Sequence, residues 1–270
     1  MTAAQKIVPD QEEYVEVRPG LYRCTFILTM AFLALPIATF LIKGNPIADE
    51  PGAHEWIMID AGAPPHADNI VETVKSVLKH PKDKLKYICI THAHLDHTGA
   101  SMVLLEHYPE CKVVSHPEEK PFLCDGKSFS SCAGDTWVFN VMKHLSMAAK
   151  IRIPENKMLL LRENENWEYS HLIKIIETHG HTPGSISFLH VPSRSIMIGD
   201  ASKNHMFTSK LPNLSYPLAT GTCHMGNAIK SMDKIISFKS EIDTIFPAHD
   251  YNPEGITVAE LQELRTSDPR

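Results

Sequence analysis

Residues 91–99 read Thr-His-Ala-His-Leu-Asp-His-Thr-Gly, and this stretch constrains the fold and chemistry of the chain more tightly than any other. Its three histidines and one carboxylate fall within six consecutive positions: His92, His94, Asp96 and His97. Neutral imidazole and carboxylate are groups that bind zinc or iron, and crowding them in one loop is unfavourable unless a cation holds them together. Because the chain has 16 histidines, some clustering is expected by chance. The neighbouring sequence must therefore distinguish a metal site from a solvated turn.

The histidine-rich stretch lies between a predicted strand and a predicted helix. Residues 84–91 form a short, apolar, β-favouring run, and residues 99–108 contain the apolar positions of a helix. The crossing from a strand to a helix is where open α/β sheets place their chemistry. This setting favours the metal site.

Three further segments place a His or an Asp directly after a short predicted strand. The strand at 172–178 precedes His181 in Gly-His-Thr-Pro-Gly, and another strand-like run follows at 185–191. The run at 195–199 leads into Asp200, and the run at 244–246 leads into Pro-Ala-His-Asp, which contains His249. Because the ends of such strands line up along one edge of a sheet, we expect these side chains to converge on the 91–99 loop.

This series of residues resembles the ligand pattern of the metallo-β-lactamase superfamily, over the chain from about Val15 to the C-terminus. The resemblance implies an α+β, four-layer αβ/βα sandwich: two mainly mixed β-sheets packed face to face, with helices outside and the metals at one edge. It also implies that two metals share seven ligands. The first metal would be held by His92, His94 and His181, the second by Asp96, His97 and His249, and Asp200 would bridge them.

Such a ligand set suits hydrolysis. Three imidazoles leave a tetrahedral cation with one open position, and a second cation nearby allows a bridging hydroxide whose pKa is near neutrality (about 7 for zinc-bound water). One metal would polarise a substrate carbonyl while the hydroxide attacks. Asp96 would be the catalytic residue, accepting a hydrogen bond from the hydroxide and passing a proton to the leaving group. We therefore expect two Zn²⁺ per chain.

Within the family, lactonases and glyoxalase II thioesterases keep all seven ligands, which predicts a hydrolase that opens a lactone, lactam or thioester bond of a small molecule. Di-iron electron-transfer members place Glu at the position of His94, and common antibiotic-degrading members lack a carboxylate at that of Asp200. The lactonases carry Tyr three residues after the bridging Asp, where this chain has Lys203. We expect Lys203 to bind an anionic group or oxyanion of the substrate, the alternative being a solvated lysine.

A competing interpretation belongs to another reaction class. The segment Pro-Ala-His-Asp-Tyr at 247–251 and the closing Asp-Pro-Arg at 268–270 resemble persulfide dioxygenases. Those oxidoreductases use a single iron, and Fe²⁺ would here be held by His92, His181 and Asp200. A count of the bound metals separates the two interpretations.

The composition fits one domain. With 270 residues, 43% of them hydrophobic, the chain can bury a single large core, and we expect one domain over 1–270 with a cap-like insertion at about 120–168. The formal charge of −6 and the lack of a basic stripe argue against nucleic acid. Six cysteines without a CxxC pair, and a polar N-terminus, predict a cytoplasmic protein. A homodimer is compatible with these features.

One segment, residues 24–42, has no charge over nineteen positions, which meets the length of a membrane span. Pro36 in its middle and three threonines (25, 29 and 39) favour two buried strands joined near residues 34–36 instead. We therefore predict no membrane span, although an exposed apolar lip contacting a substrate or a second subunit would fit the same residues. Helices are predicted at 68–80, after Asp135, and at 225–238, the last large helix.

Overall fold

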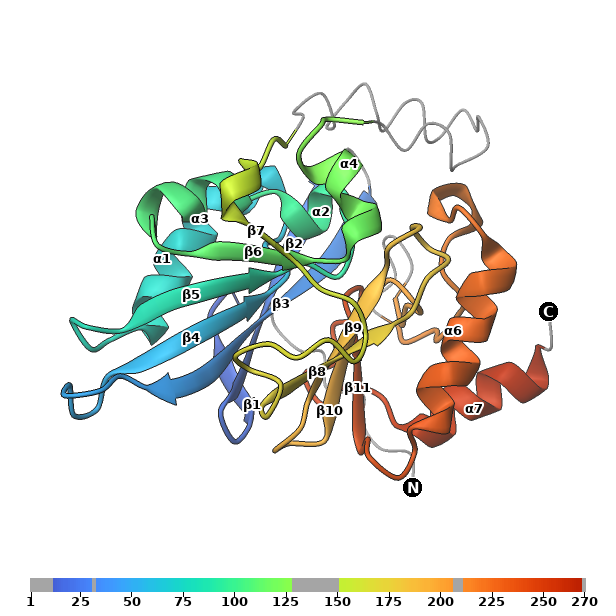
Figure 1. Cartoon of the computed structure of the whole chain (residues 1–270). Helices are drawn as coiled ribbons and strands as arrows, with labels where there is room; N and C mark the ends of the chain where they lie inside the picture. The colour runs from blue at the N-terminus through green and yellow to red at the C-terminus, as the bar shows by residue number, and fades with distance from the viewer. Residues whose placement is uncertain (1–11, 31–32, 128–150, 206–210, 269–270) are drawn as a thin grey trace.

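The computed structural model describes residues 12–30, 33–127, 151–205 and 211–268 of the chain (Figure 1). Its larger sheet has seven strands in sequence order. The first four pair antiparallel, and β4 to β7 pair parallel. The strands are β1 (Val15–Arg18), β2 (Leu21–Met30), β3 (Leu33–Pro46), β4 (His54–Ile59), β5 (Lys84–Cys89), β6 (Lys112–Ser115) and β7 (Met158–Leu160).

The smaller sheet has four strands in the order β11-β10-β9-β8. The pairs β8/β9 and β9/β10 are antiparallel, whereas β10/β11 is parallel. Both sheets are therefore mixed, as predicted. The strands are β8 (Ile173–Glu177), β9 (Ile186–His190), β10 (Ser195–Gly199) and β11 (Thr244–Pro247).

Helices cover the outer faces of the two sheets (Figure 1). On the larger sheet, Ile70, Val71 and Val74 of α1 are buried, since their spacing places them on one side of the helix. On the smaller sheet, Met232 and Ile235 of α6 are buried in the same way. The helices are α1 (Ala67–Val77), α2 (Leu95–Thr98), α3 (Ser101–His107), α4 (Lys120–Leu123), α6 (Met225–Ser237) and α7 (Val258–Ser267).

Three hydrophobic clusters separate the four layers. One lies between α1, α3 and the larger sheet, and includes Trp56 and Leu104. The second lies between the two sheets, where Phe40 of β3 packs on Phe246 of β11 with ring centroids 5.4 Å apart. The third lies between the smaller sheet and helices α6 and α7. This arrangement confirms the predicted four-layer αβ/βα sandwich.

The apolar segment 24–42 forms strands, as predicted. β2 and β3 pair antiparallel from Leu21↔Ile42 to Met30↔Leu33, so the predicted connection near residues 34–36 is wrong: it falls between Met30 and Leu33. Pro36 lies within β3 opposite Ile27, where its carbonyl oxygen accepts a hydrogen bond from Nδ1 of His249 at 2.8 Å. Proline suits the extended backbone here, so it did not mark the turn. In the described ranges, no helix is long and apolar enough to span a membrane.

The 120–168 region and the C-terminal helices differ in part from the sequence prediction. Within the expected insertion at 120–168, residues Met158–Leu160 form β7 of the larger sheet, while the helix predicted after Asp135 lies outside the described residues. The helix at 225–238 is not the last large one, because α7 follows it. Only Leu261 of α7 is buried, so the helix shows little apolar periodicity.

Candidate metal centre

The seven predicted ligands lie together at one edge of the two sheets. The 91–99 loop leaves β5, and the loops carrying the other ligands leave β8, β10 and β11. Two contacts join the sheets at this edge: the Ile186 amide donates to the Thr91 carbonyl oxygen, and the Ala38 amide of β3 donates to the Ala248 carbonyl oxygen after β11. Gly199 has a φ of +51°, and a Cβ there would lie 2.6 Å from Oγ1 of Thr91, so only glycine allows this approach.

The first group of side chains consists of His92, His94, His181 and Asp200. Nδ1 of His94 lies 3.0 Å from Nε2 of His92 and 3.0 Å from Nε2 of His181. Oδ2 of Asp200 lies 3.3 Å from Nε2 of His181 and 4.0 Å from Nε2 of His92. A tetrahedral zinc site with bonds near 2.0–2.1 Å separates neighbouring donor atoms by roughly 3.3 Å, so the spacing matches a four-donor cation site.

The second group consists of Asp96, His97 and His249. Oδ2 of Asp96 lies 3.5 Å from Nε2 of His249 and 3.8 Å from Nε2 of His97. Asp200 reaches this group as well, with Oδ1 3.2 Å from Nε2 of His97 and Oδ2 3.2 Å from Nε2 of His249. The carboxylate of Asp200 thus lies between the two groups, at the position predicted for a bridging ligand.

Hydrogen bonds at the far side of four imidazole rings orient these ligands. Nδ1 of His97 contacts Asp60 at 2.8 Å, and Nδ1 of His249 contacts the Pro36 carbonyl oxygen at 2.8 Å. Nδ1 of His92 and Nδ1 of His181 each lie 3.1 Å from a threonine hydroxyl, of Thr91 and Thr222 respectively. Those hydroxyls donate elsewhere, to Asp60 and to the Leu218 carbonyl oxygen. Each Nδ1 therefore carries a proton, and the four Nε2 atoms face the centre of the cluster.

Electrostatics agree with this assignment. Burial lowers the pKa of His94 to about 3 and that of His92 well below its usual value, so both rings are neutral at neutral pH. Burial raises the pKa of Asp200, but the charges of His249 and His97 outweigh it and hold that pKa well below its usual range. Nε2 of His97 and Oδ1 of Asp200 are buried without a hydrogen-bond partner among the residues that the structure describes. Burial lowers the pKa of His97 and His249, but the negative charge of Asp200 outweighs it and raises both, so without a cation these two rings carry the compensating positive charge. Two neutral imidazoles, an ionised Asp200 and two unpaired buried atoms fit a site in which bound cations take the place of those protons.

Lys203 is buried, with 6% of its surface exposed, so the alternative of a solvated lysine is wrong. Its backbone pairs with Ser215, and the next residue, Asn204, donates from its amide to the His249 carbonyl oxygen. Burial lowers the pKa of Lys203 to about 8, and the negative charge of Asp200 acts against this shift. Lys203 therefore lies on a loop whose backbone is hydrogen-bonded to that of His249, a predicted metal ligand.

Sequence reasoning missed the residues that hold the ligands in place. Asp60 follows β4 and accepts from the Thr91 amide at 2.8 Å as well as from His97. Glu119 is fully buried and accepts hydrogen bonds from two ligand-bearing loops. The position of Asp60 at a strand end was a usable signal, because the same argument found Asp200. Nothing in the sequence marked Glu119 or Thr222.

A further cluster, His116, Glu177 and His179, also gathers donor atoms. Nδ1 of His116 accepts a hydrogen bond from the Glu118 amide, so Nε2 carries the proton and donates to Oε1 of Glu177 at 3.2 Å. Nη1 of Arg162 lies 3.2 Å from the same nitrogen, so a positive charge already stands beside Glu177. We interpret the cluster as a hydrogen-bonded group of polar and charged side chains.

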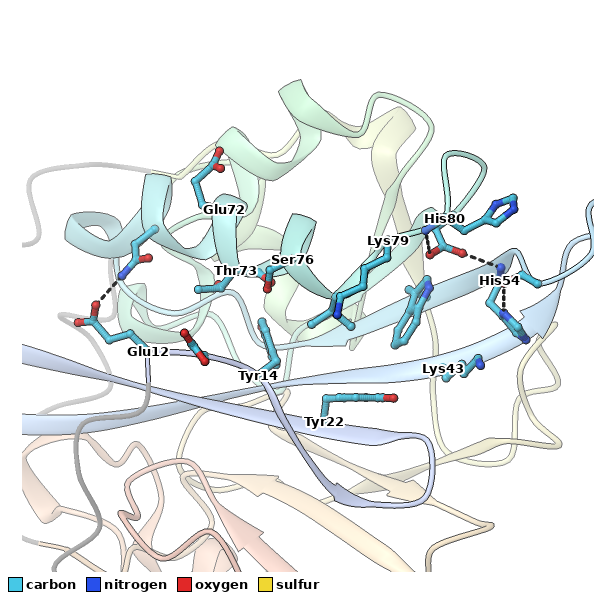
Figure 2. A pocket seen from close by; sticks show the side chains of 16 residues that line it. Glu12, Tyr14, Tyr22, Lys43, His54, Glu72, Thr73, Ser76, Lys79 and His80 are labelled. Carbon is cyan, nitrogen blue, oxygen red and sulfur yellow. Dashed lines mark hydrogen bonds between the residues drawn. The ribbon is translucent and has the colours of Figure 1, made fainter.

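A cavity of about 1020 Å³ lies away from the metal centre, on the α1 side of the larger sheet (Figure 2). Tyr22, Trp56, Thr73 and Ser76 are among its lining residues. None of the seven predicted ligands lines this cavity, and neither does Lys203. This cavity is therefore separate from the candidate metal centre.

Comparison with known proteins identifies the family. The sequence profile of the metallo-β-lactamase superfamily matches residues 47–249, which include all seven predicted ligands. The chain belongs to this superfamily. An archaeal metallo-β-lactamase superfamily protein, ST1585 from Sulfolobus tokodaii, has a similar fold, with a TM-score of 0.60 and 19% identity over 91% of this chain and 85% of that one.

Curated relatives of this metallo-β-lactamase superfamily chain include hydrolases. The probable metallo-hydrolase YflN of Bacillus subtilis (strain 168) is 29% identical over 157 residues, covering 55% of this chain and 56% of the relative. A hydroxyacylglutathione hydrolase of Prochlorococcus marinus (strain NATL1A) is 27% identical over 177 residues, covering 64% of this chain and 54% of the relative. The chain thus spans little more than half the length of these two proteins.

Proposed function

We propose that the protein is a binuclear zinc hydrolase that cleaves a carbonyl ester-type bond of a small molecule. One observation carries the proposal: four histidines, each with Nδ1 held by a hydrogen bond, turn their Nε2 atoms toward one another within a buried cluster. Such an arrangement is unfavourable unless positive charge lies between the rings.

The donor set suits two zinc ions. His92, His94 and His181 would hold the first, and Asp96, His97 and His249 the second, with Asp200 shared between them. Nitrogen and carboxylate donors without a thiolate are typical of catalytic zinc sites, which keep a position open for water or substrate. Zinc bound here would supply a water of near-neutral pKa (about 7) and polarise a carbonyl oxygen.

A side chain of the protein would transfer the proton from the attacking water to the leaving group. Asp96 has 17% of its side chain exposed, whereas the side chain of the adjacent His97 is fully buried. A carboxylate at the open side of the cluster can accept a proton from the attacking water and donate it to the leaving oxygen, sulfur or nitrogen. Asp96 is therefore our candidate for the general base and acid.

The substrate class follows from the same edge of the molecule. The ammonium of Lys203, buried on the loop that follows Asp200, would stabilise a carboxylate or an oxyanion close to the scissile bond. The similarity to a hydroxyacylglutathione hydrolase supports a thioester among the candidates. Lactones and lactams present the same carbonyl chemistry.

A panel of substrates tests this function. The zinc-loaded protein should hydrolyse at least one of a lactone, a thioester or a β-lactam, lose activity on chelation and recover it with Zn²⁺. His94→Ala should abolish the activity, whereas His171→Ala, which removes an exposed histidine outside the cluster, should not. Oxidation of a persulfide by the iron-loaded protein, with no hydrolysis by the zinc-loaded protein, would favour the single-iron alternative at His92, His181 and Asp200.

A further inference from the structure

The side chain of Glu119 joins the two loops that carry His94 and His181. It is fully buried. Its Oε2 accepts a hydrogen bond from the Ala93 amide at 2.8 Å, in the first loop. Its Oε1 accepts from the Thr182 hydroxyl at 2.8 Å and from the Gly184 amide at 2.7 Å, both in the second loop.

The contacts favour an ionised carboxylate of this size, acting against burial, which raises the pKa of Glu119. All three partners of Glu119 donate, so neither oxygen needs a proton. A Cβ on Gly184 would lie 2.9 Å from Oε1 of Glu119, so a side chain at position 184 would push the carboxylate away. A buried negative charge is unfavourable unless hydrogen bonds and positive charge compensate it, and cations at the nearby cluster would add the latter.

We infer that Glu119 is a positioning residue for the first metal. Ala93 lies between His92 and His94, and Thr182 directly follows His181, so the carboxylate fixes the 3.0 Å spacing of the His94 and His181 nitrogens. This inference rests on the proposed metal-dependent function.

The second group of ligands has separate supports. Nδ1 of His97 is held by Asp60, and Nδ1 of His249 by the Pro36 carbonyl oxygen. Loss of Glu119 should therefore weaken binding of the first cation more than binding of the second. A general loss of stability would weaken both.

Glu119→Gln is the test, with zinc affinities measured by competition with a chelator. The amide oxygen can replace only one carboxylate oxygen, and its NH₂ group must face a backbone or hydroxyl donor. We expect one of the two zinc ions to bind about 10- to 100-fold more weakly, the usual loss when an outer support of a metal site is removed, and the other to change by less than about threefold. In a His249→Ala background the same substitution should weaken the remaining zinc ion.

Glu55→Gln is the matched control. Glu55 is another mostly buried carboxylate, which accepts hydrogen bonds from Tyr169 and Lys86 away from the cluster. This variant should bind both zinc ions as the wild type does. If Glu119→Gln does not fold, Thr182→Val removes one of the three hydrogen bonds and should weaken the same zinc ion by a smaller factor.

The outcomes separate this inference from the function beneath it. A wild-type protein that binds two zinc ions, with Glu119→Gln or Thr182→Val binding both at wild-type affinity, overturns the positioning role and leaves the proposed function standing. Equal weakening of both ions also overturns it. A wild-type protein that binds no metal contradicts the proposed function itself.

Discussion

Asp96 is the predicted ligand with the clearest role beyond metal binding. Its Oδ2 lies 3.5 Å from Nε2 of His249 at the partly exposed side of the cluster. Asp96→Asn keeps an oxygen donor but removes the proton acceptor, so we expect most of the metal to remain while kcat falls about 10²- to 10⁴-fold. Metal content and turnover should be measured on the same sample. Near-normal turnover would remove Asp96 from proton transfer.

Lys203 should affect the substrate and not the metal. Lys203→Ala should lower kcat/KM with unchanged zinc content, and Lys203→Arg should restore it only in part, because the guanidinium is larger and planar. Since the pKa of Lys203 is lowered to about 8, the difference between wild type and Lys203→Ala should narrow as pH rises above that value. Identical kinetics at pH 7 in the wild type and the alanine variant would leave specificity to other residues.

His190 makes the fold sensitive to acid. It is buried on β9, which lowers its pKa to about 4, while the unfolded chain binds a proton near pH 6.5. Between these values the unfolded state holds more protons, so the free energy of unfolding falls as pH drops, by up to about 3 kcal/mol. The free energy of unfolding of the metal-free protein can be measured with urea at pH 7.5 and 4.5. It should fall less between these pH values in His190→Asn than in the wild type. The asparagine keeps a polar atom near Ser193. An equal loss in both proteins would contradict this account.

At the residue scale, the sequence predicted the seven ligands but not the residues that hydrogen-bond to them or to their loops. Each ligand follows a strand end, and the ends of neighbouring strands share an edge, so their convergence could be predicted. Thr222 reaches His181 across 41 positions, and Glu119 reaches Gly184 across 65, from a loop and a 3₁₀ turn. Without strand periodicity at either position, nothing related these pairs before the fold was known.

At the scale of elements, Gly180 sets how closely the His181 loop approaches α6. Its φ is +132°, and a Cβ would lie 2.1 Å from the amide nitrogen of Ala228. Gly180→Ala should lower the free energy of unfolding by about 2–5 kcal/mol, from backbone strain and overpacking together. Urea unfolding measures this change.

Gly226 gives the control for that substitution. It lies in α6, and no atom of the described residues outside its own stretch of helix comes within 4 Å of the position that a Cβ would occupy. Gly226→Ala should therefore be neutral or stabilise the helix by up to about 1 kcal/mol. If Gly180→Ala were as stable as Gly226→Ala, the close approach of loop and helix would not be a constraint.

Whether a strand or helix could be predicted from the sequence depended on how much of it is buried. Short apolar strands such as β5 and β10 were found from their composition, because both are largely buried. α7 was missed since only Leu261 is buried, although the capping box formed by Thr257 and Glu260 was present in the sequence. The predicted position of the β2–β3 connection is also wrong, because Pro36 favours a turn by residue type but lies in the extended backbone of β3.

At the scale of the whole molecule, the metal centre joins the two halves of the sandwich. His92, His94, Asp96 and His97 come from the larger sheet, and His181, Asp200 and His249 from the smaller one. Cations bound by both halves are bound by the folded chain only, so zinc should raise the free energy of unfolding as its concentration exceeds the dissociation constant. The mixed order of strands, and hence this pairing of halves, came from the family resemblance and not from the periodicity of the sequence.

The central claim is that this edge of the molecule holds two metals sharing Asp200, and elemental analysis of the zinc-supplemented protein tests it most directly. We predict close to two zinc ions per chain in the wild type and in His171→Ala, and loss of both in Asp200→Ala, because Oδ1 and Oδ2 of Asp200 reach both groups. His249→Ala should lose chiefly one. A wild-type protein with a single stable iron and no second site, or an Asp200→Ala variant that retains both metals, would contradict it.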